Sequence, residues 1–236
     1  MSGVAAPARP PRFAVADYGA GNLVSIDQAL TRVGAAVTVA HDPSGLAGAD
    51  ALIVPGVGAA APAMDRLADA GLVGPIRAWI ASGRPYLGIC LGLQLLFEGS
   101  DEDGAVTLGV IPGRTTRLRD APTLPHIGWN QVERVRDHPL FTGIGPGADF
   151  YFVHSYAGSP GGPGADATTL AWTSHGAPFV SAIARANVLG VQFHPERSGT
   201  DGLRLLANVV ELVRSGRLDV APAAPGAPDT TLAVSA

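Results

Sequence analysis

Short apolar segments alternate with longer amphipathic segments through the first hundred residues, and this alternation constrains the fold more than any other feature. The apolar segments predict buried strands at residues 12–17, 35–40, 51–56 and 86–89, and the others predict helices at residues 23–33, 64–81 and 91–98. Strands that alternate with helices are joined by right-handed crossovers, which make the strands parallel. The sequence therefore predicts an α/β fold with a central, mostly parallel sheet flanked by helices.

The pattern changes after residue 100, where short strand-like segments follow one another. Glycine, proline and aspartate turns separate them, which favours hairpins and antiparallel pairing. These segments are residues 105–111, 126–135, 149–156, 167–173, 179–185 and 188–195. An amphipathic helix over residues 202–215 is predicted to close the domain. The second half thus adds an antiparallel extension to the sheet.

A chain of 236 residues is long enough for one domain with a sizeable core but cramped for two. We assign that domain to residues 12–216. Residues 1–11 are expected to form a flexible leader, and residues 217–236 a disordered Ala/Pro-rich tail. No segment resembles a signal peptide or a membrane span, so a cytoplasmic protein is expected.

Charge and cysteine content argue against several classes of function. The net charge is −4, which gives no general attraction for nucleic acid or an anionic membrane. The single cysteine, Cys90, leaves no partner for an intrachain disulfide and excludes a multi-cysteine metal site. We expect no metal and no cofactor.

Cys90 stands between Gly88 and Gly92, where a buried strand is expected to turn sharply into a helix. Such a turn strains its central residue, and small neighbours leave room for it. The turn exposes the thiol, and the positive end of the following helix favours the thiolate. The pattern predicts a nucleophile, with the Leu91 amide as an oxyanion donor. The alternative is an inert buried cysteine on a core strand, the commoner fate of a lone cysteine.

A thiol nucleophile benefits from a base, and the strand-like segment at residues 188–195 offers one. It runs into a His-Pro-Glu triplet, and residues two apart in an extended chain share a face. Glu196 would then orient His194 as a base for Cys90. A surface histidine beside a glutamate at a strand end is the alternative. Three other histidines lie in polar turns, where we expect them to be exposed: His41, His138 and His175.

A glycine-rich turn at residues 53–59 follows the third predicted strand. Glycines let backbone amides approach a ligand closely, so this turn could complete an oxyanion hole. An ordinary strand-ending turn is the alternative. The order cysteine, histidine, glutamate also differs from that of α/β-hydrolases, in which the acid precedes the histidine.

Together these pieces resemble the class I, or triad, glutamine amidotransferases, and most closely the glutaminase subunits of imidazole glycerol phosphate synthases. The resemblance covers residues 13–216 and implies the single-domain fold of that family. The G-x-C-x-G and His-Pro-Glu motifs mark the wider family, and DYGAGN, PHIGWN and FVHSY mark this branch. The motifs are DYGAGNLVS (17–25), PGVGA (55–59), GICLGLQLLFEGS (88–100), PHIGWN (125–130), YFVHSY (151–156) and GVQFHPERS (190–198).

The resemblance implies a reaction. Cys90 would attack the side-chain amide of glutamine, expel ammonia and leave a γ-glutamyl thioester. His194, oriented by Glu196, would protonate the ammonia and later take a proton from water. The amides expected to hold the oxyanion are those of Leu91, Gly56, Val57 and Gly58. The residues expected to bind glutamine are Gln94, Glu102, Ser155 and Tyr156. The alternatives are a solvated acidic loop for Glu102 and a surface position for Gln94.

The resemblance also implies a partner, because the chain is too short to hold a synthetase domain as well. That partner is a (βα)8-barrel cyclase subunit in a heterodimer. It would combine ammonia with the intermediate PRFAR to form imidazole glycerol phosphate and AICAR in histidine biosynthesis. The residues expected near the interface are Asn22, Trp129 and Arg197.

The chain departs from the family pattern in three places. Arg197 stands where lysine is common, which keeps the charge but changes the geometry of an ion pair. Leu93 replaces a common methionine, a change that conserves volume. Residues 158–167 form a longer, glycine-rich loop near a strand that is expected to line the pocket.

Two other functions stay open on the sequence alone. In one, the chain supplies ammonia to a different acceptor, such as chorismate or the pyridoxal phosphate ring. In the other, it is a regulatory protein that kept the fold and lost catalysis, against which the intact Cys90, His194 and Glu196 argue. The sequence does not show how a partner activates the site. We expect residues 55–58 to reorient, because a glycine turn flips easily.

Overall fold

The computed structural model describes residues 9–162 and 164–218 of the chain. No helix in those ranges is long and apolar enough to cross a membrane. Most of the expected leader and tail lies outside the described residues. Of the parts that are described, Arg9 forms an ion pair with Asp50, 2.7 Å between Nη1 and Oδ2, and Leu218 is buried. The domain limits 12–216 remain a prediction.

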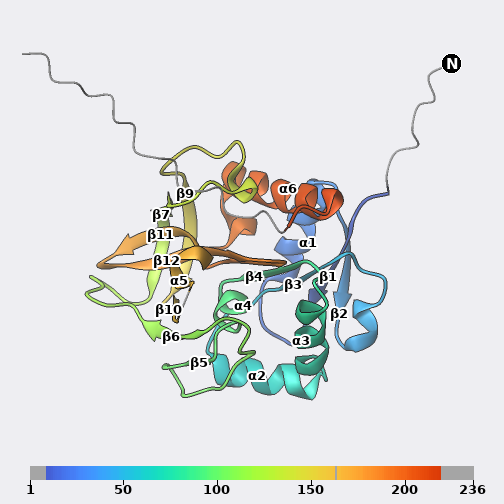
Figure 1. Ribbon diagram of the computed structural model, residues 1–236, viewed down its shortest axis with the longest axis horizontal. Coiled ribbons are helices and arrows are strands. Elements are labelled where there is room, and N and C mark those ends of the chain that lie inside the picture. The colour runs from blue at the N-terminus through green and yellow to red at the C-terminus, as the bar shows by residue number, and fades with distance from the viewer. Residues whose placement is uncertain (1–8, 163, 219–236) are drawn as a thin grey trace, which may run out of the picture.

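An eight-stranded sheet forms the centre of the molecule (Figure 1), in the order β2-β1-β3-β4-β13-β12-β11-β8. The strands from β2 to β13 are parallel, and the rest continue the sheet in antiparallel pairing. The bounds are β1 Arg12–Ala16, β2 Ala36–Ala40, β3 Ala51–Val54, β4 Tyr86–Ile89, β8 Glu133–Arg134, β11 Thr169–His175, β12 Ala177–Arg185 and β13 Val188–Val191. The expected α/β fold with an antiparallel extension is confirmed.

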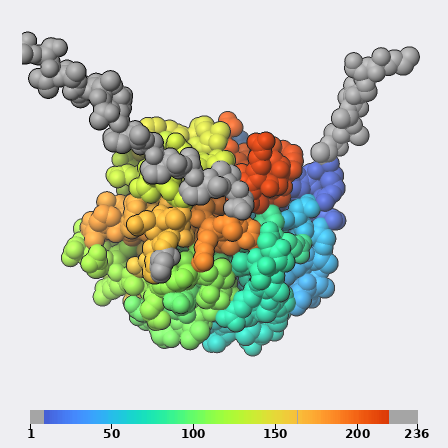
Figure 2. Space-filling view, in the orientation of Figure 1, coloured from blue at the N-terminus to red at the C-terminus, as the bar shows by residue number. Residues whose placement is uncertain are grey.

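Helices cover both faces of the parallel part of the sheet (Figure 1). On one face lie α1 (Leu23–Arg32) and α6 (Gly199–Ser215), which contact each other. On the other face lie α2 (Ala60–Asp69) and α3 (Val73–Ala81). Figure 2 shows α6, in red, next to the N-terminal part of the chain, in blue.

The sheet separates two hydrophobic clusters, because successive residues of a strand point to opposite faces. Val15 of β1 belongs to the same cluster as Val209 of α6. Its neighbour Ala14 belongs to the other cluster, with Trp79 of α3. The parallel sheet is therefore buried on both sides, as its apolar strands predict.

Two smaller sheets complete the fold. β7 pairs with β9, and a second sheet has the order β10-β6-β5. The remaining bounds are β5 Gly99–Ser100, β6 Gly113–Arg117, β7 His126–Gln131, β9 Asp149–His154, β10 Tyr156–Pro160, α4 Leu91–Gln94, α5 Ala165–Thr168 and the 3₁₀ turns η1 Pro43–Leu46, η2 Pro139–Phe141 and η3 Pro195–Arg197. The chain leaves one small sheet for the other at Ser155, so the strand expected over 149–156 is divided between them.

The strand expected over residues 105–111 is wrong apart from one isolated bridge between Val106 and Gly99. The amides of Leu108 and Val110 donate instead to the carbonyls of Leu95 and Leu96, at 2.9 and 2.8 Å. This segment therefore satisfies the carbonyls that follow α4. The helix expected over residues 91–98 is correspondingly short, since α4 ends at Gln94.

The helix expected over residues 64–81 is two helices. Gly71 adopts a φ of +67°, a left-handed conformation that ends α2 and lets α3 start in a new direction (Figure 1). The last helix, by contrast, is longer than expected, because α6 begins at Gly199 rather than at residue 202.

The start of α4 packs directly on the end of β3, and Gly92 makes this approach possible. A Cβ atom on Gly92 would overlap the carbonyl oxygen of Val54. A Cβ atom on Gly88 would lie 2.5 Å from the carbonyl oxygen of Gly92. Both glycines are therefore required by space, as the sharp turn at Cys90 predicts.

We expect Gly92→Ala to lower the free energy of unfolding by about 3 kcal/mol, because the new methyl group must push α4 away from β3. Urea unfolding followed by circular dichroism measures the change. Gly74→Ala in α3 is the matched control, because its Cβ would meet no atom within 4 Å and alanine favours a helix. Equal stabilities of the two variants would contradict the steric argument.

Candidate active site

Cys90 lies between β4 and α4 in a strained backbone conformation. Its φ is 53° and its ψ −108°, a region that residues other than glycine rarely adopt. The side chain is only 3% exposed, so the expectation that the turn exposes the thiol is wrong: Cys90 packs in the cluster of the α1–α6 layer. Because α4 has only four residues, its dipole is weaker than the longer predicted helix would supply.

His194 and Glu196 meet after the end of β13. The Nδ1 of His194 lies 2.8 Å from the Oε1 of Glu196, and both side chains are almost fully buried. The geometry differs from the expected extended chain, because Pro195–Arg197 forms the 3₁₀ turn η3. The carboxylate therefore reaches the imidazole by a tight turn and not by sharing a strand face.

The free nitrogen of His194 is available for proton transfer. Its Nε2 is buried, and no residue in the described ranges lies within hydrogen-bonding geometry of it. Burial lowers the pKa of His194, but the charge of Cys90, a hydrogen bond toward it and the bond to Glu196 outweigh burial and raise this pKa to about 10. His194 can thus carry a proton beside Cys90 at neutral pH.

The predicted oxyanion donors are close to Cys90 but not all aimed at it. The Leu91 amide donates a 3.4 Å hydrogen bond to the carbonyl oxygen of Gly56. Because the N–H and C=O of a trans peptide point in opposite directions, the Val57 amide points away from the Leu91 amide. Val57 itself is 48% exposed. The turn 55–58 therefore presents a carbonyl, and not an amide, to Leu91.

A cavity of about 220 Å³ opens beside the thiol. It is lined by Gly58, Ala59, Cys90, Leu91, Gln94, Glu102, Pro125, Val153, His154, Ser155 and Tyr156. All four residues expected to bind glutamine are thus brought together with Cys90. Gly56 and Val57 are not among the lining residues.

Gln94 is buried and not a surface helix residue. Its Nε2 donates to the carbonyl oxygen of Tyr156 at 2.7 Å and to Oε1 of Gln192 at 3.1 Å. Gln192, which sequence reasoning missed, also places its Nε2 3.6 Å from the Cys90 Sγ. The sequence does hold a signal for Gln192. It precedes His194 by two residues in the same apolar segment, and residues two apart in an extended chain share a face.

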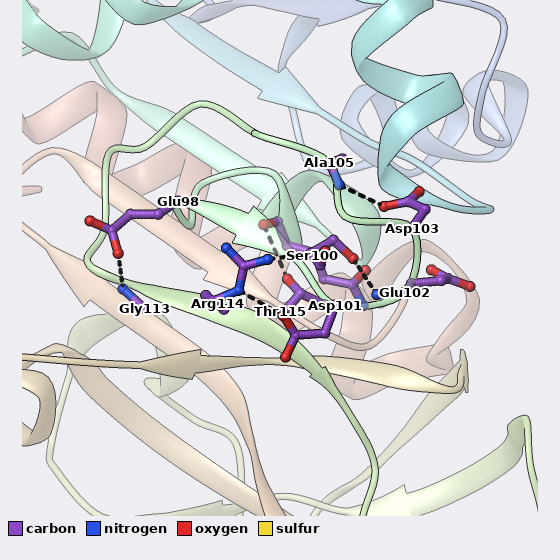
Figure 3. Close-up of polar contacts among 10 residues, drawn as sticks. Glu98, Ser100, Asp101, Glu102, Asp103, Ala105, Gly113, Arg114 and Thr115 are labelled. Atoms are coloured by element: carbon purple, nitrogen blue, oxygen red, sulfur yellow. Dashed lines mark hydrogen bonds and ion pairs between the residues drawn. The ribbon is translucent and has the colours of Figure 1, made fainter.

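Glu102 is held by the loop that follows β5 (Figure 3). Its amide donates to the Ser100 hydroxyl at 3.2 Å, and the Ala105 amide donates to Asp103 at 3.2 Å. Arg114 braces the loop through Asp101 at 2.7 Å. Burial and, second, the charge of Asp103 raise the pKa of Glu102. Within residues 9–162 and 164–218 no hydrogen bond or ion pair involves the Glu102 carboxylate, so this cavity residue is available to a cationic ligand group.

Three histidines form a cluster behind the cavity that the sequence did not predict. His154 Nδ1 lies 2.9 Å from the Tyr156 carbonyl oxygen, and His126 Nδ1 lies 3.3 Å from His154 Nε2. His175 stacks on His126 at 4.1 Å between ring centroids. His175 and His138 are half-buried, so the expectation that they are exposed is wrong, whereas His41 is exposed as expected.

The expected interface residues divide into two groups. Asn22 caps α1, accepting from the Ser25 amide at 3.2 Å. Trp129 is 57% exposed, and its ring packs edge-on against Tyr151 at 6.2 Å. The guanidinium of Arg197 lies 4.1 Å over the same Tyr151 ring. Tyr151, missed from the sequence, therefore joins Trp129 and Arg197 in one surface group.

Residues 14–212 match the family model described as glutamine amidotransferase class-I. The chain is 49% identical over 200 residues to the imidazole glycerol phosphate synthase subunit HisH of Symbiobacterium thermophilum, covering 84% of this chain and 92% of that protein. It is 48% identical over 203 residues to the subunit of the same name from Moorella thermoacetica, covering 86% and 95%. With that of Synechococcus elongatus it shares 46% over 215 residues, covering 89% and 98%.

Solved structures with lower identity show the same fold. A putative GMP synthase subunit from Thermoplasma acidophilum aligns with a TM-score of 0.66 at 19% identity, covering 88% of this chain and 96% of that one. PurLQS from Thermotoga maritima aligns with a TM-score of 0.67 at 16% identity, covering 86% and 99%. The similarity therefore extends over nearly the whole of both structures.

The histidine cluster predicts that stability falls in acid. Burial lowers the pKa of His126 to about 4 and that of His154 to about 3. An unfolded histidine titrates near pH 6.5, so between about pH 6.5 and 4 the unfolded chain binds more protons. We expect the free energy of unfolding to fall by up to about 1.4 kcal/mol per pH unit for each histidine, measured by urea unfolding.

The matched variants are His154→Gln and, at an exposed position, His41→Gln. In the first variant, the free energy of unfolding should depend less steeply on pH, by the contribution of one histidine. In the second, the slope should be that of the unaltered protein. Identical slopes for His154→Gln and the unaltered protein would contradict the assignment of a neutral buried His154.

Proposed function

This chain belongs to the class I glutamine amidotransferase family, and we propose that it is the glutaminase subunit of an imidazole glycerol phosphate synthase. The observation that carries the proposal is that Cys90, strained and beside a cavity, acts by its charge and a hydrogen bond on the His194 that is paired with Glu196. The relatives that bear this name share nearly half of their residues with the chain over most of its length. The chain would work in the cytoplasm and supply ammonia for histidine biosynthesis.

In the first half of the proposed reaction, the Cys90 thiolate attacks the side-chain carbonyl carbon of glutamine. The tetrahedral intermediate collapses when the C–N bond breaks, and protonated His194 gives its proton to the leaving nitrogen. Ammonia leaves and a γ-glutamyl thioester remains on Cys90. The buried Glu196, 2.8 Å from His194 Nδ1, keeps the imidazole oriented for this transfer.

In the second half, neutral His194 takes a proton from water, and the resulting hydroxide attacks the thioester. The C–S bond breaks, which releases glutamate and restores the thiolate beside protonated His194. The raised pKa of His194, to about 10, suits a resting state in which this proton is already in place.

The turn 55–58 would complete the oxyanion hole only after a change of orientation. The Gly56 carbonyl oxygen now accepts from the Leu91 amide at 3.4 Å. Rotation of the peptide between Gly56 and Val57 would remove that oxygen and bring the Val57 amide toward the intermediate. We propose that binding of the partner favours this rotation, so this chain is weakly active by itself.

The cavity residues would bind the α-amino and α-carboxylate groups of glutamine. The Glu102 carboxylate suits the ammonium group, and backbone groups around Ser155 and Tyr156 line the other side. The buried Gln94 would act mainly through the Tyr156 carbonyl that it holds at 2.7 Å.

The partner in this proposal is a (βα)8-barrel cyclase that uses the ammonia to make imidazole glycerol phosphate and AICAR from PRFAR. The exposed surface group of Trp129, Tyr151 and Arg197 would contact it, together with Asn22. An exposed tryptophan beside a tyrosine ring that is itself covered by an arginine is a typical interface anchor. Ammonia made beside Cys90 would then be released close to the partner. A chorismate or pyridoxal phosphate acceptor is disfavoured by the names that the relatives carry.

We expect Cys90→Ala to lower glutamine-dependent synthesis by the complex by about 10³-fold or more, because the nucleophile is lost. Ammonia-dependent synthesis by the same complex should stay unchanged. Both rates are measured from the absorbance change as the imidazole product forms. Glutamine hydrolysis at the normal rate in this variant would sink the assignment of Cys90, and failure of 6-diazo-5-oxonorleucine to label the native chain would favour a regulatory protein.

Truncation of the proposed anchor, Trp129→Ala, should weaken the complex by about 2 kcal/mol or more, roughly a thirtyfold rise in Kd. Isothermal titration with the cyclase measures it. Val135→Ala is the control, because Val135 is 53% exposed and does not belong to the group of Trp129, Tyr151 and Arg197. Equal affinities for the two variants would place the interface elsewhere.

A further inference from the structure

Tyr18 is a buried hydroxyl-bearing residue that the proposed reaction does not use. It follows β1 in the DYGAGN motif and is only 4% exposed. Its hydroxyl donates a 2.6 Å hydrogen bond to the carbonyl oxygen of Pro55, the first residue of the turn 55–58. Tyr18 thus connects the first loop of the chain to the turn that must supply an oxyanion amide.

The Tyr18 hydroxyl also lies directly against Gly56. A Cβ atom on Gly56 would overlap that hydroxyl and would lie 2.8 Å from the Cβ of Leu91. Gly56 is therefore enclosed between Tyr18 and the oxyanion donor Leu91. Motion of the peptide that precedes Gly56 is restricted by this contact and by the hydrogen bond to the Pro55 carbonyl oxygen.

A second contact ties the far end of the same turn to the same loop. Arg66 of α2, the helix that follows the turn, donates from Nη1 to the carbonyl oxygen of Gly19 at 3.2 Å. The turn is thus anchored before Gly56 by Tyr18 and after it by α2. The peptide between Gly56 and Val57 lies between these anchors, and Gly56, which carries no side chain, leaves it free to rotate on one side.

Tyr18 stays a donor throughout the working pH range. Burial and, second, the nearby charge of Cys90 raise the pKa of its phenol, so the hydroxyl keeps its proton. The hydrogen bond to the Pro55 carbonyl is therefore kept over this pH range, and the Pro55 carbonyl stays fixed while the next peptide rotates.

We propose that Tyr18 is a positioning residue for glutamine hydrolysis. Its hydroxyl holds the Pro55 carbonyl, so that only the Gly56–Val57 peptide rotates. The Val57 amide then points at the oxyanion. The inference rests on the proposed function. Without the hydroxyl, rotation spreads over the Pro55–Gly56 peptide as well, and the amide is aimed less accurately. Loss of a whole oxyanion donor lowers kcat by about 10²–10³-fold, so loss of its pivot should have a smaller effect of about 10-fold.

The test is Tyr18→Phe, assayed in the complex with the cyclase and its nucleotide ligand. The ring remains, so the cavity and the substrate contacts stay intact. We expect kcat for glutamine hydrolysis to fall about 10-fold or more, while KM for glutamine changes less than about twofold. Alkylation of Cys90 by iodoacetamide, which needs no oxyanion hole, should proceed at the unaltered rate.

A second measurement separates positioning from general destabilisation. Glutamate γ-semialdehyde forms a thiohemiacetal with Cys90 whose oxygen occupies the oxyanion position, so Tyr18→Phe should weaken its binding by about the factor by which kcat falls, without weakening that of glutamate. Thr173→Val is the matched control, because it removes a buried hydroxyl that donates to the Gln131 carbonyl at 2.9 Å, away from the turn. It should change neither kcat nor analogue binding.

The outcomes are distinguishable. A Tyr18→Phe complex with unaltered kcat, a loss confined to KM, slower iodoacetamide labelling, or an equal effect from Thr173→Val would overturn the role of Tyr18. An unaltered complex that hydrolyses no glutamine would instead overturn the proposed function, whatever the variant does.

Discussion

The active-site geometry depends on one close backbone approach, that of the start of α4 to the end of β3. Because Gly92 carries no side chain, the turn at Cys90 can pack against the Val54 carbonyl, and the Leu91 amide comes within 3.4 Å of the Gly56 oxygen. Cys90 has a strained φ of 53°, which the buried strands on either side hold in place. Its amide donates to the carbonyl oxygen of Val191, at the end of one of these strands, at 2.8 Å. The proposed nucleophile, the proposed oxyanion donor and the turn 55–58 are thus placed together by a single contact between backbone segments.

Three other groups reach this point, each from the end of a different strand. Tyr18 follows β1, the turn 55–58 follows β3, and His194 follows β13, in keeping with the general position of sites at the carboxyl ends of parallel strands. The antiparallel part supplies the other wall of the cavity at Ser155, where the chain changes sheets. The His194 amide bonds to the Tyr151 carbonyl at 2.9 Å, so the same wall also reaches the surface group of Trp129, Tyr151 and Arg197.

The parallel core and the elbow at Cys90 could be predicted because both depend on local patterns: alternating apolar segments, and glycines at set distances from a cysteine. What failed depends on contacts between distant segments. Residues 105–111 have the composition of a strand, yet their amides bond to carbonyls after α4. The histidine cluster joins β7, β9 and β11, which no spacing reveals. His194 and Glu196 were paired correctly but for the wrong geometric reason, since the proline between them starts a 3₁₀ turn.

Cys90 and Leu91 are neighbours in the chain, but their side chains belong to opposite hydrophobic clusters, the first with α1 and α6 and the second with α2 and α3. The thiol is therefore mechanically coupled to one helical layer, and the residue that carries the oxyanion amide to the other. Shear of one layer against the other would therefore twist the backbone between these two residues. The geometry at Cys90 and Leu91 therefore depends on the two helical layers keeping their relative position.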